Sequence, residues 1–203
     1  MSPPERPPGD PSSERDPSER DPEPGLLGEI NRLDTAVYSA IARSPTPSID
    51  EALRKLSSAA DKSKISVVVA ASIALAAGPE GRRAAARGLA SVAATSAVMN
   101  IAIKRLAKRR RPDRTGAEVP EARHVEMPES FSFPSGHSAS AFAFAAGAGR
   151  TLPWIAPPLT ALATLVAYSR VHTGVHYPMD VIIGALCGVT IAELTNRAID
   201  RIR

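Results

Sequence analysis

The stretch Phe133–Gly149, FPSGHSASAFAFAAGAG, changes within a few residues from small polar side chains to an alanine-rich run without charge. Pro134, Ser135 and Gly136 are typical of a turn. The length and composition of Ser138–Gly149 predict a helix that follows this turn directly.

The start of this helix is a candidate anion site. The first backbone N–H groups of a helix have no partner within it, and the helix dipole favours negative charge there. We expect Gly136 to let a ligand approach the backbone and His137 to point into the same space. A lone histidine at a helix start is more often a capping or packing residue, so His137 alone does not define a site.

Four more apolar, alanine-rich stretches accompany this one: Ile65–Ala77, Ala84–Ile103, Pro153–Ser169 and Val181–Leu194. A helix needs about 20 residues to cross the hydrocarbon core of a bilayer. Several of the stretches reach that length only with their polar ends. The predicted fold is all-α, a membrane-embedded bundle of about five to six helices. Hydropathy alone leaves a soluble helical bundle open.

The N-terminal part of the chain has a different composition. Residues 1–25 include eight prolines and ten charged residues, and we expect a disordered tail. Residues 26–60 have apolar side chains at helical spacing between polar ones, which predicts amphipathic helices. Residues 61–203 then form the domain that carries the chemistry. The single cysteine, Cys187, is expected to be a small buried apolar residue.

Basic residues cluster before a proline. Seven of the eleven positions from Lys104 to Arg114 are Lys or Arg, although the net charge of the chain is only +4. Lys104 and Arg111 are seven residues apart, so both can project from one helix face, and two cations there suit a dianionic phosphate. Taken alone, the cluster equally suits anionic lipid headgroups, the role that we assign to Lys108, Arg109 and Arg110.

A third segment, Ser169–Asp180, contains a histidine at a helix start. Pro178 suits the first turn of a helix, and Asp180 lies four residues after His176. The carboxylate is expected to fix the tautomer of the imidazole and to support the cation formed when the other ring nitrogen attacks phosphorus. His172 also precedes His176 by four residues, but the intervening glycine argues against a zinc pair.

Together, the three segments resemble the signature of the PAP2 (type 2 phosphatidic acid phosphatase) superfamily. That signature reads Lys, six residues, Arg-Pro; then Pro-Ser-Gly-His; then Ser-Arg, five residues, His, three residues, Asp. The defining positions are all present and in order: Lys104, Arg111, Pro112, Pro134, Ser135, Gly136, His137, Ser169, Arg170, His176 and Asp180. The region from Ser-Ala-Ala-Asp near residue 60 through Val-His-Tyr-Pro looks most like actinobacterial members.

The resemblance implies a helical bundle with a phosphate pocket at the ends of its core helices. It implies that His176 attacks the phosphoryl group to form a phosphohistidine and that Asp180 orients His176. It further implies that His137 protonates the leaving oxygen and then activates water. The phosphoryl oxygens would be held by Lys104, Arg111, Ser135, Gly136 and Arg170. No metal and no cofactor are implied, since the cations stabilise the charge.

The implied activity is metal-independent hydrolysis of a phosphate or diphosphate ester on a lipid. Candidate substrates are a polyprenyl phosphate or diphosphate, a prenyl-linked phosphosugar, phosphatidate and phosphatidylglycerol phosphate. Expected partners are this substrate and membrane lipids, with no nucleic acid, and homo-oligomers are left open. The alternatives are a vanadate-dependent haloperoxidase, which shares the motifs but is soluble and larger, and a non-enzymatic membrane lipid-binding protein.

The expected location is the bacterial cell membrane. If the three motifs share one side, the other side carries an arginine-rich set: Arg82, Arg83, Arg87, Arg150, Arg197, Arg201 and Arg203. Positive residues tend to stay in the cytoplasm. This favours an active site on the outer face.

Overall fold

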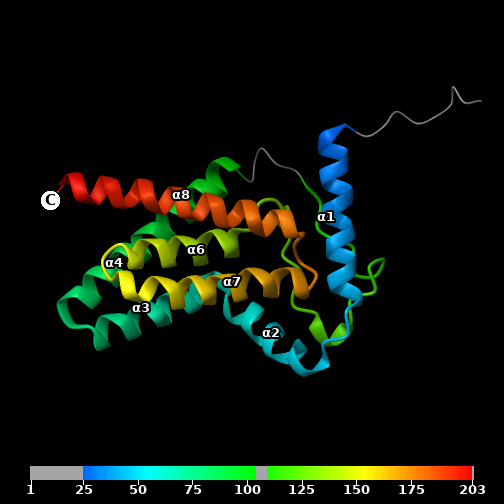
Figure 1. Ribbon diagram of the computed structural model, residues 1–203, viewed down its shortest axis with the longest axis horizontal. Coiled ribbons are helices and arrows are strands. Elements are labelled where there is room, and N and C mark those ends of the chain that lie inside the picture. The colour runs from blue at the N-terminus through cyan, green and yellow to red at the C-terminus, as the bar shows by residue number, and fades with distance from the viewer. Residues whose placement is uncertain (1–24, 104–108, 203) are drawn as a thin grey trace, which may run out of the picture. The chain divides into compact units, whose positions relative to one another are not determined.

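The computed structural model describes residues 25–103 and 109–202, and within them every regular element is helical. The chain divides into two compact units, residues 1–33 and 34–203. Figure 1 shows the elements in chain order: α1 (Leu26–Arg43), α2 (Pro47–Ala59), α3 (Lys64–Ala76), α4 (Gly78–Val98), α6 (Gly136–Gly149), α7 (Ala156–His172) and α8 (Pro178–Ile202). The all-α class is confirmed.

The described residues contain seven α-helices, more than the five to six predicted for the bundle. The difference arises because residues 26–60 form two complete helices in addition to one helix from each apolar stretch. The stretch Ala84–Ile103 also differs from its prediction, because α4 begins earlier, at Gly78, and passes at Met99 into a π-helical turn that ends at Ile103. The predicted tail lies outside the described residues except for Gly25.

Helices α6 and α8 lie side by side in the larger unit, and two glycines of α8 set their spacing (Figure 1). A Cβ atom on Gly184 would overlap the backbone oxygen of Ser135, and one on Gly188 would overlap that of Ala139. The backbones therefore touch without intervening side chains. This contact places the start of α6, with its Pro-Ser-Gly-His turn, beside the start of α8.

Two apolar clusters stabilise the unit. One lies among α3, α4, α6 and α7 and includes Phe144 and Leu159. The other, around Tyr38 and Val171, supports the end of the bundle where α7 and α8 meet. Burial of apolar area of this kind is the main force that stabilises such a core.

One helix of the described residues, α8, is long and apolar enough to cross a membrane, and α3 is a shorter apolar helix. Several large apolar side chains of α8 are exposed, among them Leu186 and Leu194, each 59% accessible.

Candidate active site

His176 lies in the turn between α7 and α8, at the end of the bundle where α6 also begins. Gly174 enters the left-handed region with φ +72°, which reverses the chain after α7. The amides of Val175 and His176 both donate to the carbonyl oxygen of Arg170, at 3.1 and 3.2 Å. The turn is thus fixed by backbone bonds, and His176 is only 2% exposed.

The two ring nitrogens of His176 face groups of opposite charge. Nδ1 lies 3.5 Å from Oδ2 of Asp180, and Nε2 lies 3.3 Å from Nη1 of Arg111. A guanidinium carries only donors, so Nε2 must present its lone pair to Arg111. The proton of the neutral ring is therefore on Nδ1, facing Asp180, and Nε2 is the nitrogen able to attack phosphorus.

Burial away from water lowers the pKa of His176 to about 4. The guanidinium groups of Arg111 and Arg170 act in the same direction, while Asp180 acts in the opposite one. The imidazole is therefore neutral near pH 7, which is the nucleophilic form.

Arg111 is held by the loop before α6 and by the turn between α7 and α8. Its Nε donates to the carbonyl oxygen of Ser130 at 2.8 Å, and its Nη1 donates to that of Val175 at 2.7 Å. The guanidinium is thus fixed beside Nε2 of His176, where a phosphoryl group under attack would lie.

The Pro-Ser-Gly-His turn starts α6 as predicted. The Ser135 hydroxyl caps the helix by accepting from the Ser138 amide at 3.4 Å, and the Ser135 amide donates to the carbonyl oxygen of Asp180 at 2.8 Å. Ser135 therefore joins α6 to α8 in addition to its predicted role on phosphate. His137, two residues after Ser135, has Nε2 2.9 Å from Oδ1 of Asp61.

Arg170 is buried at the end of α7. Its Nη1 donates to the hydroxyl of Ser57 at 2.7 Å and to the Ser57 carbonyl oxygen at 3.0 Å. The structure thus gathers at one end of the bundle the predicted residues Arg111, Ser135, Gly136, His137, Arg170, His176 and Asp180. Lys104 lies outside the described residues.

His172 does not take part in this site. Its Nε2 lies 3.0 Å from the Thr46 hydroxyl and 3.1 Å from Asp50, on a side of α7 held by α2. Among the residues that the structure describes, no group of three His, Cys, Asp or Glu side chains is placed to share a metal ion.

Arg109 was assigned to lipid headgroups from the sequence, and that assignment is wrong. Its guanidinium pairs with Asp180 at 2.9 Å and with Asp34 of α1 at 2.7 Å, and it lies 4.0 Å above the centre of the Tyr177 ring. Asp34 also accepts from the Met179 amide at 2.8 Å. Arg109 therefore supports Asp180, the carboxylate that faces His176.

The profile of the PAP2 superfamily matches residues 85–203. This chain belongs to that superfamily. The match covers the Arg111–Pro112, Pro-Ser-Gly-His and His176–Asp180 segments whose geometry is described above.

The relatives with known names are phosphatases. The decaprenylphosphoryl-5-phosphoribose phosphatase of Mycolicibacterium smegmatis is 34% identical over 160 residues, covering 78% of this chain and 84% of that protein. Its counterpart in Mycobacterium tuberculosis is 38% identical over 96 residues, covering 47% of this chain and 51% of the relative. This chain thus spans only about half the length of that relative.

Two solved structures share the fold. A transmembrane PAP2 type phosphatidylglycerolphosphate phosphatase from Bacillus subtilis superposes with a TM-score of 0.63 at 24% identity, covering 86% of this chain and 88% of the other. LpxE from Aquifex aeolicus superposes with a TM-score of 0.62 at 22% identity, covering 81% of this chain and 95% of the other.

Proposed function

We propose that this chain is a membrane phosphatase that removes a phosphate from a polyprenyl-linked substrate through a phosphohistidine on His176. The observation that carries the proposal is the setting of His176, with the lone pair of Nε2 beside Arg111 and Nδ1 facing Asp180. The relative from M. smegmatis, which acts on a decaprenyl-linked phosphosugar by its name, supports the substrate class.

In the first step, Nε2 of His176 attacks phosphorus and the bond from phosphorus to the substrate oxygen breaks. His137 gives a proton to the leaving oxygen, and the phosphoryl group remains on His176. In the second step, His137 takes a proton from water, the oxygen attacks phosphorus, and the bond to Nε2 breaks. Phosphate leaves and both rings return to their starting state.

The charges around His176 fit these two reaction steps. Asp180 is fully buried and faces the Nδ1 proton, so it stabilises the positive charge that the ring acquires when it is phosphorylated. Arg111 and Arg170 oppose the negative charge of the phosphoryl oxygens. Preorganised cations of this kind are worth more in a site from which water is excluded.

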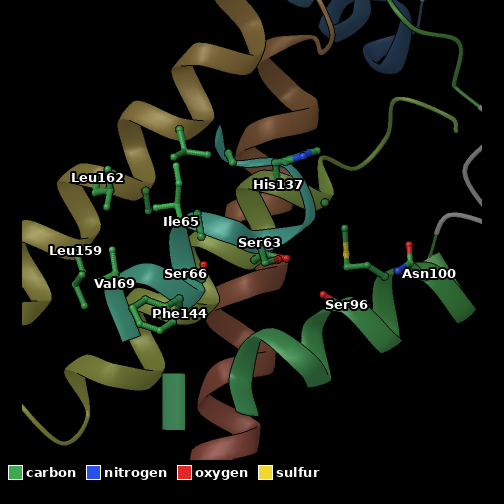
Figure 2. Close-up of a pocket in the computed structure, with 17 residues that line it drawn as sticks. Ser63, Ile65, Ser66, Val69, Ser96, Asn100, His137, Phe144, Leu159 and Leu162 are labelled. Carbon is green, nitrogen blue, oxygen red and sulfur yellow. The ribbon is translucent and has the colours of Figure 1, made fainter. Parts of the chain in front are cut away.

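An apolar cavity of about 190 Å³ begins at His137 and extends among α3, α4, α6 and α7. Figure 2 shows Val69, Phe144 and Leu159 grouped in the cavity away from His137. Because His137 protonates the leaving oxygen, the lipid part of the substrate is released next to this cavity. We assign the cavity to the first part of its hydrocarbon chain.

We also propose that the protein is embedded in a bacterial cell membrane with the site on the outer face. The exposed apolar side chains of α8 support contact with lipid. The ends of α4 and α8 remote from His176 carry arginines, including Arg82, Arg83, Arg197 and Arg201, which favours a cytoplasmic position for that end. Cysteines introduced at Glu118 and at Arg201 in intact cells provide the test: an impermeant maleimide should label only the first.

The activity is tested with detergent-purified protein in EDTA. The panel pairs a decaprenyl-linked phosphosugar and polyprenyl mono- and diphosphates with phosphatidate and phosphatidylglycerol phosphate. We expect phosphate release from the polyprenyl class, inhibition by vanadate, and loss of turnover in His176→Ala. Equal turnover by that variant would refute the phosphohistidine mechanism, and release from glycerolipids alone would refute the substrate class.

A further inference from the structure

Asp61 lies at the edge of the active site, on a segment that the family profile does not include. It begins the short 3-10 helix η3 (Asp61–Ser63) between α2 and α3, whereas the profile match starts at residue 85. Oδ1 of Asp61 is 2.9 Å from Nε2 of His137 and 3.6 Å from Nη1 of Arg170. A single carboxylate oxygen therefore faces both the general acid–base and a phosphate-binding arginine.

The backbone holds Asp61 in this place. The amide of Lys64 donates to the Asp61 carbonyl oxygen. Ser63 has φ 57°, a conformation that residues other than glycine adopt at a cost of about 1–3 kcal/mol and that persists when the surroundings impose it. Ser63 and His137 both line the apolar cavity, so η3 borders the side from which the leaving group departs.

We propose that Asp61 is a positioning residue for His137, an inference that rests on the proposed function. A carboxylate only accepts, so the ring nitrogen facing it, Nε2, carries a proton. This fixes the rotation of the ring and leaves Nδ1 to exchange a proton with the leaving oxygen and later with water. The negative charge of Asp61 stabilises the imidazolium that His137 must be before the first step.

Two histidine–carboxylate pairs thus act in opposite senses. Asp180 supports a ring that starts neutral and becomes charged as it attacks, whereas Asp61 supports a ring that starts charged and becomes neutral as it donates. Their surroundings differ accordingly. The Asp180 side chain is fully buried, and that of Asp61 is 45% exposed, which lets His137 exchange protons with solvent between steps.

The test uses Asp61→Asn, which keeps the shape and an acceptor but removes the charge. We expect kcat on the polyprenyl substrate to fall by roughly 10- to 100-fold, a part of the ~10²- to 10⁴-fold that positioned acid–base catalysis contributes. On p-nitrophenyl phosphate, whose leaving group needs little protonation, the loss should be several-fold smaller. Asp61→Glu, which keeps the charge, should recover part of the rate.

The pH profile separates this role from a purely structural one. The alkaline limb of kcat/KM should move to lower pH in Asp61→Asn, because the imidazolium of His137 loses its partner, and should stay in place in Asp61→Glu. Both variants leave the other charged and titratable groups at this end of the bundle unchanged, among them Arg109, Arg111, Arg114, Arg170, His176, Tyr177 and Asp180. Glu51→Gln, which removes an exposed carboxylate from α2, is the matched control and should behave as the wild type.

Each outcome decides the proposal. Suppose that the wild type is active and that Asp61→Asn matches it in rate, leaving-group dependence and pH profile. That result would overturn the role of Asp61, while the proposed function would stand. If the wild type releases no phosphate, the proposed function fails, and the ring ¹⁵N shifts of His137 decide instead. A titration that moves to lower pH in Asp61→Asn supports the pairing, and one that does not move overturns it.

Discussion

Replacing Arg109 with glutamine removes the cation that bridges two buried carboxylates. The side chains of Asp34 and Asp180 are 1% and 0% exposed, and Arg109 pairs with them at 2.7 and 2.9 Å. Removing one partner of a buried ion pair costs about 3–5 kcal/mol, because the remaining charge is left uncompensated.

The structure places Arg109→Gln near the lower end of that range. Each carboxylate keeps one backbone donor, the Tyr177 amide for Asp180 and the Met179 amide for Asp34, and Arg109 itself is partly accessible to water. A loss of about 3 kcal/mol corresponds to a fall in melting temperature of about 6–12 °C for a domain of this size.

A double-mutant cycle with Asp34→Asn tests the bridge itself. Once Asp34 is neutral, Arg109→Gln leaves one buried charge uncompensated instead of two, so the double variant should be more stable than the sum of the single losses by about 1–3 kcal/mol. The assay is thermal unfolding in detergent, followed by fluorescence of Trp154. Losses that add to within about 0.5 kcal/mol would refute the bridge.

Three further predictions concern the nucleophile, the helix contact and the cavity. The His176 ring should keep its neutral, nucleophilic form from pH 7 down to about pH 4. Below that pH the ring is protonated, and kcat/KM should fall. Because its folded-state pKa lies below the ordinary value of 6.5, the wild type should lose stability as pH falls from 6.5 to about 4, and His176→Gln should lose less; equal slopes in a melting series would contradict this. Gly188→Ala should force α6 and α8 apart, at a cost of about 1–3 kcal/mol and most of the turnover, while Val189→Ala on the exposed face of the same helix should change neither melting nor rate. Val69→Phe should fill the cavity and raise KM for polyprenyl substrates by about 10-fold or more, with KM for p-nitrophenyl phosphate unchanged; a parallel rise for both would remove the cavity from lipid binding.

The sequence predicted which residues lie together at the His176 end of the bundle better than it predicted the contacts that hold them there. His176 and Asp180 are four residues apart at a helix start, so their contact follows from local geometry. The positions of helices α6 and α7 were predicted equally well, because each is an apolar run next to Pro and Gly. Local rules of this kind need no knowledge of the tertiary structure.

The supporting contacts depend on segments far apart in the chain. Asp34 lies in a segment that was predicted only to be amphipathic, and its apolar spacing gives no sign that Asp34, Tyr38 and Ala42 are the residues that α1 buries. Arg109 stands among several cations, and nothing in their spacing distinguishes the one that turns inward. Asp61 and His137 are brought together by the path of α2 and α3, which an alanine-rich pattern does not specify.

The backbone contact of Gly184 and Gly188 with α6 has a consequence for how such enzymes diversify. The helices that begin beside the two histidines of the proposed mechanism, His137 and His176, meet without intervening side chains, whereas much of the apolar cavity is lined from α3 and α7. Residues such as Val69 and Leu159 line the cavity without contributing to the contact between α6 and α8. If the cavity holds the lipid chain as proposed, exchanging the inner faces of α3 and α7 between relatives should transfer the preferred lipid and leave the contact between α6 and α8 unchanged.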